Sequence, residues 1–220
     1  MPTERFYRLP QEKTEVIRKA AAREFMRVPP EEASINRIIR DAEISRGSFY
    51  TYFTNKEDLL RWLIGGSIKR HLRFYVNRMQ ENGGDIWDVF DQVLDATIDQ
   101  TVADGLIEII ENLMKSNTLS ELFQKGMEED SKAGNQARRH ADWLYQHLNP
   151  EKCPMDRDTF QDLMEIHRTV LMMALKRFFK EGRRRELVTE YYKRYMRILR
   201  YGISGYRGVM QEEKKQEENR

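Results

Sequence analysis

The chain has little that could cross-link it, kink it or anchor it. Its 220 residues include one cysteine, six prolines and no apolar run of the roughly 18 residues that a membrane-spanning helix needs. A single cysteine, Cys153, excludes an internal disulfide and a zinc site built on several thiolates. Charged residues occupy 1–10, where a secretory signal would be apolar. We therefore expect a cytoplasmic protein with no membrane contact.

The chain also lacks a large excess of basic over acidic residues, or the reverse. The 38 Lys and Arg residues against 36 Asp and Glu residues give a formal net charge of +2, which by itself does not indicate a nucleic-acid-binding protein. The distribution is uneven, because residues 85–130 hold twelve acidic and two basic side chains. This middle segment would repel DNA, so any contact with nucleic acid is expected from the N-terminal end.

Helical spacing of apolar residues runs through almost every long segment. Ile17, Ala21 and Phe25 recur every four residues, for example, and no segment alternates convincingly as a strand would. The pattern predicts an all-α fold. The expected helices are 10–26, 35–42, 45–52, a long fourth helix opened by a Thr54–Glu57 capping box and reaching Met79, 85–104, 106–115, one or two helices over 118–148, 158–181 and 186–210. The expected domains are 1–64 and 65–210, followed by a charged, frayed tail at 211–220.

The most informative segment runs from Ala33 to Lys56 and reads ASINRIIRDAEISRGSFYTYFTNK. It predicts two short helices across a tight turn, followed by a capped third. The second helix is unusual, because Gly47 costs a helix about 1 kcal/mol relative to alanine and stands between Arg46 and Ser48. Such a glycine lets the backbone approach another surface, and a helix braced in this way fits the major groove of B-DNA. The alternative is an ordinary amphipathic helix pair buried in an all-α domain.

The segment also resembles a known family. The strings Ser34-Ile35-Asn36-Arg37-Ile38-Ile39 and Ile44-Ser45-Arg46-Gly47-Ser48-Phe49-Tyr50-x-Tyr52-Phe53-x-x-Lys56-Glu57 are similar to the N-terminal DNA-binding domain of the TetR/AcrR family of bacterial transcriptional regulators. The resemblance implies a three-helix helix-turn-helix domain joined by a long fourth helix to a C-terminal helical domain for effector binding and dimerisation. It assigns DNA contacts to Ser34, Ser45, Arg46, Gly47, Ser48, Tyr50, Tyr52 and Lys56.

The chemistry of these residues suggests how the contacts divide. Arg46, Ser48 and the Gly47 backbone would reach base edges, whereas Ser34, Tyr50, Tyr52 and Lys56 would hold phosphates and fix the register. Two positions depart from the family pattern. Glu43 stands where the family usually has a glycine before the recognition helix, and it should cost roughly 1 kcal/mol if its backbone is left-handed. Residues 29–32, Pro-Pro-Glu-Glu, replace the usual glycine-aromatic turn.

On this resemblance, the expected function is a ligand-responsive transcriptional regulator, most often a repressor. It would bind a palindromic double-stranded DNA operator as a homodimer, paired through residues 158–181 and 186–210, and a small-molecule effector would release it. The same helices could instead pack only within one subunit. No catalysis, metal or cofactor is expected.

Candidate effector contacts are apolar and aromatic residues of the C-terminal part. The set is Trp87, Phe90, Met114, Trp143, Met164 and His167, with Trp62 and Met172 as further possibilities. Each of them could equally be core packing, and a histidine on an apolar face is more often a hydrogen-bonded core residue. Cys153 could be a redox sensor, although an exposed, unremarkable thiol is the preferred interpretation.

A rival function rests on an acidic ladder in the helix expected at 85–104. Asp85, Asp88, Asp91, Asp95 and Asp99 recur at spacings of three and four, with Asp158 and Asp162 as a second pair. Such carboxylates could hold a diphosphate through Mg²⁺ in a small all-α enzyme, or serve a lipid-type binding protein. The preferred interpretation is a solvated helix face, because the spacing places the ladder opposite Phe90, Val93 and Leu94.

Overall fold

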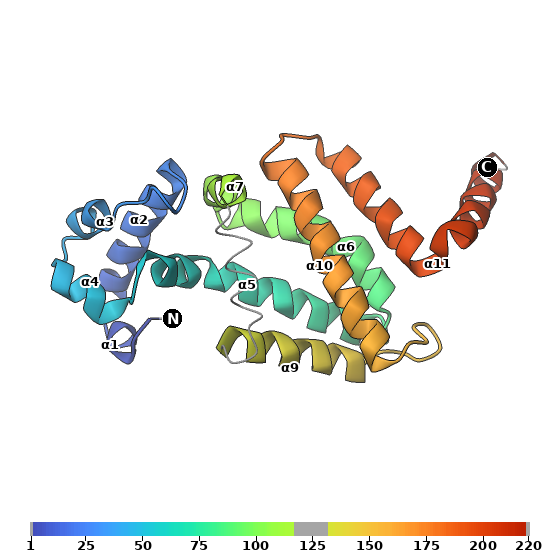
Figure 1. Cartoon of the computed structure of the whole chain (residues 1–220), viewed down its shortest axis with the longest axis horizontal. Helices are drawn as coiled ribbons and strands as arrows, with labels where there is room; N and C mark the ends of the chain where they lie inside the picture. The colour runs from blue at the N-terminus through green and yellow to red at the C-terminus, as the bar shows by residue number, and fades with distance from the viewer. Residues whose placement is uncertain (1, 117–131, 219–220) are drawn as a thin grey trace. The chain divides into compact units, whose positions relative to one another are not determined.

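The computed structural model describes residues 2–116 and 132–218, with the backbone alone over 132–137 and 203–218. Throughout these ranges the regular elements are α-helices, which confirms the all-α prediction (Figure 1). They are α1 (Glu4–Tyr7), α2 (Gln11–Arg27), α3 (Ile35–Asp41), α4 (Arg46–Tyr52), α5 (Lys56–Glu81), α6 (Ile86–Ala103), α7 (Ile107–Lys115), α9 (Lys132–Gln146), α10 (Arg157–Phe179) and α11 (Arg185–Glu218). In the described ranges, none of these helices combines the length and the apolar character needed to cross a membrane.

The helices form two compact units. The first unit contains residues 1–73 and 99–138, and the second contains residues 74–98 and 139–220. This division does not follow the boundary expected between residues 64 and 65, because α7 packs against α2 inside the first unit. There the buried Asn112 amide donates hydrogen bonds to the carbonyl oxygens of Phe25 and Met26, at 2.9 and 2.8 Å. An α7 side chain thereby satisfies two carbonyls at the C-terminal end of α2.

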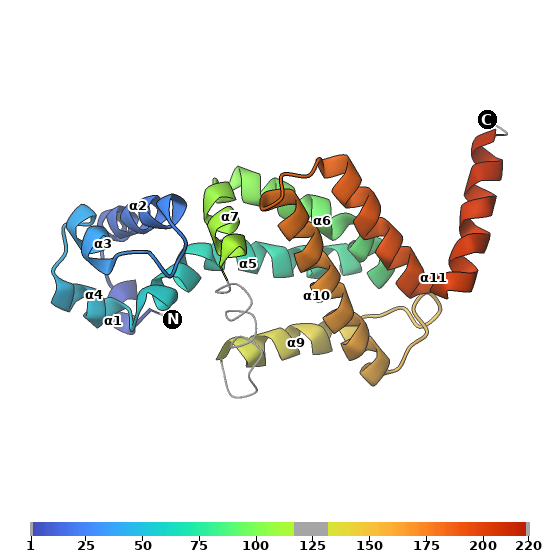
Figure 2. The ribbon, with the colours of Figure 1, turned by 45° about the horizontal axis from the view of Figure 1, so that its top comes forward.

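Aromatic rings fill the core of the first unit around the helix-turn-helix segment. Phe49 and Phe53 are fully buried, and the short helix α1, which the sequence did not predict, adds Phe6 to them. The Phe6 ring lies 4.8 Å from that of Phe53 and 4.9 Å from that of Trp62. The Thr3 N–H also donates to the Tyr52 carbonyl at 3.0 Å. The segment containing α1 therefore fixes the C-terminal end of α4 (Figure 2).

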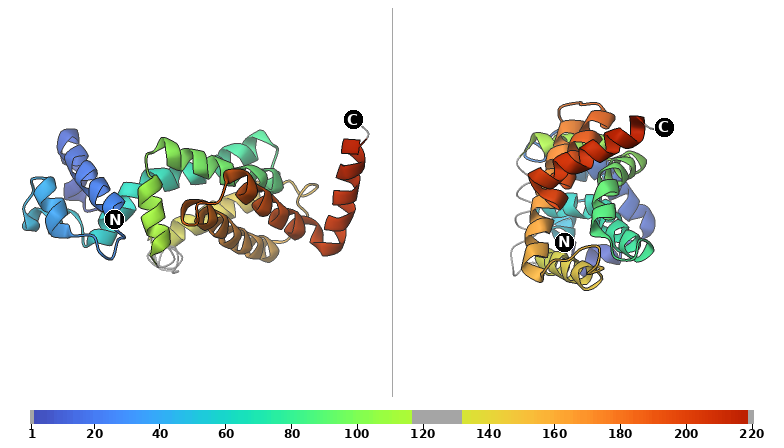
Figure 3. Two further views of the ribbon diagram at one scale, coloured as in Figure 1. Left: turned by 90° about the horizontal axis from the view of Figure 1, so that it is seen from above. Right: turned by 90° about the vertical axis from the view of Figure 1, so that its right-hand side faces the viewer.

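The second unit is built from long helices. Helices α10 and α11 are joined by residues 180–184 and lie side by side (Figures 1 and 3). The turn between α5 and α6 meets the loop after α9, where the Asn149 N–H donates to the Gly84 carbonyl at 3.0 Å. Helix α11 bends at Gly202, which has φ 67° (Figure 2).

Three sequence expectations need correction or fall outside the described residues. Helix α5 is capped one residue later than expected: Asn55 Oδ1 accepts from the Asp58 N–H at 2.8 Å, and Asp58 accepts from the Thr54 N–H. The tail expected to fray at 211–220 is helical as far as Glu218, since Gln, Glu and Lys favour helix even without apolar residues. The capping box expected at Thr118 and Glu121 lies outside the described residues, and α9 covers the end of that segment.

Candidate nucleic-acid interface

Two serine caps and a strained turn form the helix-turn-helix segment. Ser34 Oγ accepts from the Arg37 N–H at 3.4 Å at the start of α3, and Ser45 Oγ accepts from the Ser48 N–H at 3.0 Å at the start of α4. Because each helix has only seven residues, these caps are a large part of its local stability. Glu43 in the turn has φ 52°, which is left-handed, so the condition under which its backbone carries strain is met.

A buried carboxylate positions the first of these caps. Glu24 of α2 is 3% exposed and accepts from the Ser34 N–H at 2.8 Å and from Arg27 at 2.8 and 3.1 Å, with Arg37 Nε 3.8 Å away. Desolvation raises the pKa of Glu24, but the hydrogen bonds from Arg27 and Ser34 outweigh it, so the pKa lies below its ordinary value. Glu24 therefore ties the start of α3 to α2.

The exposed edge of α4 carries an oriented arginine. Arg46 Nη1 donates to Asn36 Oδ1 of α3 at 2.7 Å, and Nη2 donates to the Tyr50 hydroxyl at 3.4 Å. The guanidinium also lies over the Tyr50 ring, 5.6 Å from its centroid. Behind this edge Phe49 is fully buried and braces α4 against the core. The arrangement holds a planar, five-donor group at the surface of a braced helix.

Gly47 and Ser48 leave room beside this arginine. A Cβ added at Gly47 would meet only Ser45 Oγ within 4 Å, so packing inside the protein does not require a glycine here. Ser48 Oγ lies 2.9 Å from Ser45 Oγ at the first turn of α4. A backbone without a side chain at this exposed position permits close approach of an external surface.

The other two predicted contact residues are partly used within the protein. The Tyr52 ring packs edge-on against Phe6 at 5.9 Å and is half-buried. Lys56 Nζ donates to the carbonyl oxygens of Glu31 and Ala33, at 2.6 and 3.4 Å, and so holds the loop before α3. Lys56 therefore has a structural contact that the sequence did not indicate.

Sequence reasoning missed Asn36 and Glu24. Both act through contacts ten residues away along the chain, Asn36 with Arg46 and Glu24 with the Ser34 N–H. A spacing of ten falls outside the i to i+4 range in which helical patterns are informative. For Asn36 the available signal was a polar residue at the start of a short helix. For Glu24 it was an acidic residue on an otherwise apolar helix face.

In the second unit, several candidate effector contacts are packed together as core. The His167 ring is fully buried, stacks on Phe90 with centroids 3.8 Å apart, and hydrogen-bonds through Nε2 with the Tyr192 hydroxyl at 2.7 Å. Trp87 packs edge-on against Phe90, and Met164 is buried, whereas Trp143 is half-buried and stacks on His147.

Met114, another candidate effector contact, is buried but belongs to the first unit. Of the two further possibilities, Trp62 packs with Phe6 and Phe53 in the first unit, and Met172 lies half-buried on α10. An effector role for any of these residues stays a prediction.

The acidic ladder of α6 is not the solvated face that the spacing suggested. Asp88 accepts from Arg78 and Asn82, each at 2.8 Å. Asp95 accepts from Arg185 at 2.8 Å and from Thr189 at 3.1 Å, both on α11. The ladder therefore connects helices, because carboxylates at helical spacing can face basic side chains of a neighbouring helix as well as water.

Of the remaining members of the ladder, Asp99 is exposed, whereas Asp85 and Asp91 are partly buried. Asp85 accepts from the Trp87 N–H at 3.0 Å at the start of α6. Burial raises the pKa of Asp91, although Lys193, Arg197 and Arg200 of α11 oppose the shift. Among the described residues, no group of three His, Cys, Asp or Glu side chains could hold a metal ion.

Cys153 is buried, which corrects the preferred interpretation of an exposed thiol. Its side chain is 1% exposed and packs near Gly84 and Asp85 at the start of α6. Burial raises the pKa of the Cys153 thiol, in spite of backbone hydrogen bonds from Ile86 and Trp87. The loop containing Cys153 folds back onto the α5–α6 turn, a contact between segments about 70 residues apart that local spacing does not reveal.

Comparison with known proteins identifies both parts of the chain. Residues 17–63 match the family of bacterial regulatory proteins of the tetR type, and residues 85–203 match the tetracyclin repressor-like C-terminal domain. A crystal structure of a TetR family transcriptional regulator from Chloroflexus aurantiacus J-10-FL is similar at 23% sequence identity and a TM-score of 0.33. The similarity covers 88% of this chain and 97% of that one. No curated protein matches the chain.

Proposed function

Because the chain belongs to the TetR family of bacterial regulatory proteins, we propose that it is a ligand-responsive repressor that binds a palindromic operator as a homodimer. The proposal goes beyond family membership in three respects: the residues that touch DNA, the pairing of two copies, and release by a small molecule. The observation that supports it best is the exposed edge of α4, where Arg46 is oriented by Asn36 and Tyr50 over a buried aromatic brace.

The proposed contacts follow from the geometry of that edge. Arg46 and Ser48 reach base edges in the major groove, and Gly47 lets the α4 backbone approach the duplex. Ser34, Ser45, Tyr50, Tyr52 and Lys56 contribute on the phosphate side and set the register. The half-burial of Tyr52 and the carbonyl contacts of Lys56 orient both residues before DNA arrives, which reduces the entropy lost on binding.

Two copies present two such edges to the duplex. A two-fold dimer paired through α10 and α11 places its recognition helices about one DNA turn apart, roughly 34–36 Å, as a palindromic site requires. An effector bound in the second unit releases the operator only if it has higher affinity for a dimer conformation whose recognition helices are wrongly spaced. The regulator is preferred to the enzyme alternative because two carboxylates of the α6 ladder already have partners: Asp88 accepts from Arg78 and Asn82, and Asp95 accepts from Arg185 and Thr189.

The test is operator binding by Arg46→Ala. Duplexes selected from a random-sequence library by the wild-type protein serve as ligand, and binding is followed by fluorescence anisotropy over a range of salt concentrations. We expect Arg46→Ala to lose at least about thirtyfold in affinity for the selected site, because a base contact contributes about 1–3 kcal/mol in each half-site. Affinity for unrelated duplex should change much less.

Arg18→Ala is the matched control. Arg18 is an exposed α2 arginine paired with Glu15, and its removal deletes the same charge from the first unit without touching α4. The control should bind the selected site within about threefold of wild type. Equal losses for the two variants would mean that Arg46 contributes only net charge, and the base-contact assignment would then be wrong.

A further inference from the structure

Residues 2–8, which we call the N-terminal segment, are fastened to the recognition helix. The Thr3 N–H donates to the Tyr52 carbonyl at 3.0 Å, and Thr3 Oγ1 donates to the Thr51 carbonyl at 2.8 Å. Phe6 anchors the segment in the aromatic core, and α1 lies beside α4 (Figure 2). The family match over residues 17–63 leaves the segment out, so family membership assigns it no role. Any surface that meets the C-terminal end of α4 nevertheless comes close to this segment.

The exposed side chains of the N-terminal segment include two arginines. Arg5 and Arg8 are both exposed, and Arg5 has no ion-pair partner among the described residues. Arg8 lies 3.5 Å from Glu4, but the two side chains are 79% and 91% exposed, so water and salt weaken this pair. Both guanidinium groups can therefore bind an external anion at little cost to the fold.

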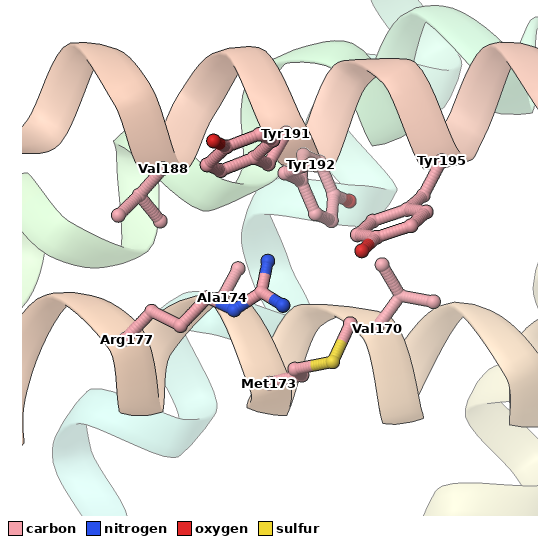
Figure 4. A pocket seen from close by; sticks show the side chains of 8 residues that line it. All are labelled: Val170, Met173, Ala174, Arg177, Val188, Tyr191, Tyr192 and Tyr195. Atoms are coloured by element: carbon pink, nitrogen blue, oxygen red, sulfur yellow. The ribbon is translucent and has the colours of Figure 1, made fainter. Parts of the chain in front are cut away.

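Tyr7 adds an open aromatic hydroxyl beside these arginines. At 61% it is the most exposed large apolar side chain of the described ranges, and its ring contact is edge-on to Phe6 with centroids 5.7 Å apart. By comparison Tyr191, which borders the cleft between α10 and α11, is 39% exposed and lies under the guanidinium group of Arg177 (Figure 4). Among the described residues no cation covers Tyr7 in this way, so its hydroxyl is available to a partner.

The attachment point also favours a negatively charged partner. A helix C-terminus carries a partial negative charge on its unsatisfied carbonyl oxygens, which is unfavourable beside a phosphate. The donations from Thr3 satisfy the Thr51 and Tyr52 carbonyls at this end of α4. From Arg46 to Tyr52 the helix rises about 9 Å, and the major groove is about 12 Å wide. With Arg46 at the base edges, the Tyr52 end therefore lies close to the phosphates that border the groove.

We propose that Arg5, Tyr7 and Arg8 form a second phosphate-binding surface, which holds the DNA backbone beside the groove that α4 enters. The guanidinium groups and the Tyr7 hydroxyl donate to phosphate oxygens. Such contacts carry no sequence information, so the surface adds affinity and fixes the register without adding a base preference. The inference rests on the proposed operator binding and extends it to a segment outside the helix-turn-helix.

The salt dependence of duplex binding tests this surface. Each arginine that neutralises a phosphate releases counterions, so its removal reduces the slope of log K against log salt concentration by about one. Arg5→Ala/Arg8→Ala removes two contacts from each copy of a dimer, so the slope should fall in magnitude by about three to four. Affinity at physiological salt should fall at least about tenfold, to the same extent for the selected duplex and for unrelated duplex.

Arg18→Ala/Arg23→Ala is the charge-matched control, because it removes two exposed arginines of α2, one of them paired with a glutamate as Arg8 is. It should leave the slope within about one of the wild-type value. Arg5→Lys/Arg8→Lys keeps both charges and should retain the wild-type slope. Tyr7→Phe keeps the ring but loses the hydroxyl, so it should weaken binding about threefold without changing the slope.

Hydroxyl-radical footprinting of the selected duplex locates the contact. Arg5→Ala/Arg8→Ala should lose protection of the backbone at the edge of each half-site, whereas protection inside the half-site should remain. Arg46→Ala should instead lose its preference for the selected sequence. Thermal unfolding of each variant should match wild type, since the substituted side chains are exposed.

The outcomes separate this inference from the proposed function. A wild-type chain that binds no duplex at low salt overturns both. If Arg46→Ala abolishes specific binding while Arg5→Ala/Arg8→Ala keeps the wild-type slope and footprint, the second phosphate-binding surface is wrong and the proposed function stands. An equal change of slope in the α2 control would mean that only net charge matters, and this too would overturn the surface.

Discussion

The polar contacts at the start of α4 and those that join the long helices of the second unit act over different distances along the chain. At the start of α4 the contacts are local: Ser45 with Ser48, and Asn36 with Arg46, span three and ten residues. In the second unit Arg185 and Asp95 are 90 residues apart, and the His167–Tyr192 pair spans 25. Short helices depend on caps made by near neighbours, whereas long helices satisfy their own backbone and use side chains to select a partner helix.

The buried polar groups show the same contrast. Glu24 in the first unit is charged, and its hydrogen bonds hold backbone and arginine groups in place. In the second unit two buried tyrosines are neutral: burial raises the pKa of Tyr75 and of Tyr192 above their ordinary value, so both stay protonated. The stability that the charged Glu24 contributes should therefore depend on pH in the acid range, whereas the contribution of the neutral Tyr75 and Tyr192 should not.

The largest effect is expected at a close backbone contact in the second unit. Gly84 has φ 83°, and a Cβ there would lie 2.4 Å from the His147 carbonyl oxygen and 2.6 Å from the Asn149 nitrogen. Gly84→Ala should therefore destabilise the protein by about 3 kcal/mol or more in urea unfolding, adding backbone strain to overpacking.

Gly83→Ala is the matched control for that substitution. Gly83 has a similar φ of 67° but no atom within 4 Å of an added Cβ, so only the strain of about 1 kcal/mol should appear. Hydrogen exchange of peptides from residues 74–98 should localise the Gly84 effect. Equal destabilisation by the two alanines would show that the loop moves away and that the contact is not a rigid one.

An intermediate effect is expected at the buried acid of the first unit. Glu24→Gln leaves Arg27 without its charged partner and should cost about 2 kcal/mol at pH 7. Because the pKa of Glu24 lies below its ordinary value of 4.5, the folded state binds this proton less readily than the unfolded state. The stability that Glu24 contributes is therefore present above pH 4.5 and is lost as the pH falls below it.

Urea unfolding of wild type and Glu24→Gln between pH 7 and pH 3 measures this dependence. The difference in unfolding free energy between wild type and Glu24→Gln should become smaller as the pH falls. Glu15→Gln, which removes an exposed carboxylate paired with Arg18, should leave the free energy of unfolding nearly unchanged at either end of this pH range, because solvent screens the pair. If the difference in unfolding free energy between wild type and Glu24→Gln stayed constant from pH 7 to pH 3, the charged form of Glu24 would contribute nothing to stability.

The smallest effect, of opposite sign, is expected in the turn before α4. Glu43 is the single residue other than glycine with positive φ in the described ranges. Glu43→Gly should stabilise the protein by up to about 1 kcal/mol, since glycine adopts this conformation without strain but loses more chain entropy on folding. Glu32→Gly, a loop glutamate without positive φ, should only destabilise. A loss of stability in Glu43→Gly would show that entropy outweighs the strain.

Local signals predicted most of the secondary structure and the form of the candidate interface. The two short helices α3 and α4 were expected at nearly the bounds that the structure gives, and each begins at a serine cap made by residues three positions apart. Helix α1 was missed because four residues show no periodicity, and the structure holds it through Phe6 and Thr3. The cap of α5 was displaced by one residue because Thr54 and Asn55 are both good N-cap residues.

The sequence by itself determined the family, the all-α class and the helix-turn-helix segment, since these depend on short-range spacing, capping chemistry and a compact motif. Tertiary structure alone decided that the α6 carboxylates bind basic side chains and Thr189 of other segments, that Asn112 closes the end of α2, and that Cys153 is buried. Helical spacing shows which residues share a face but not what covers that face. The covering partner can lie 90 residues away, where only the packing of whole helices brings it into contact.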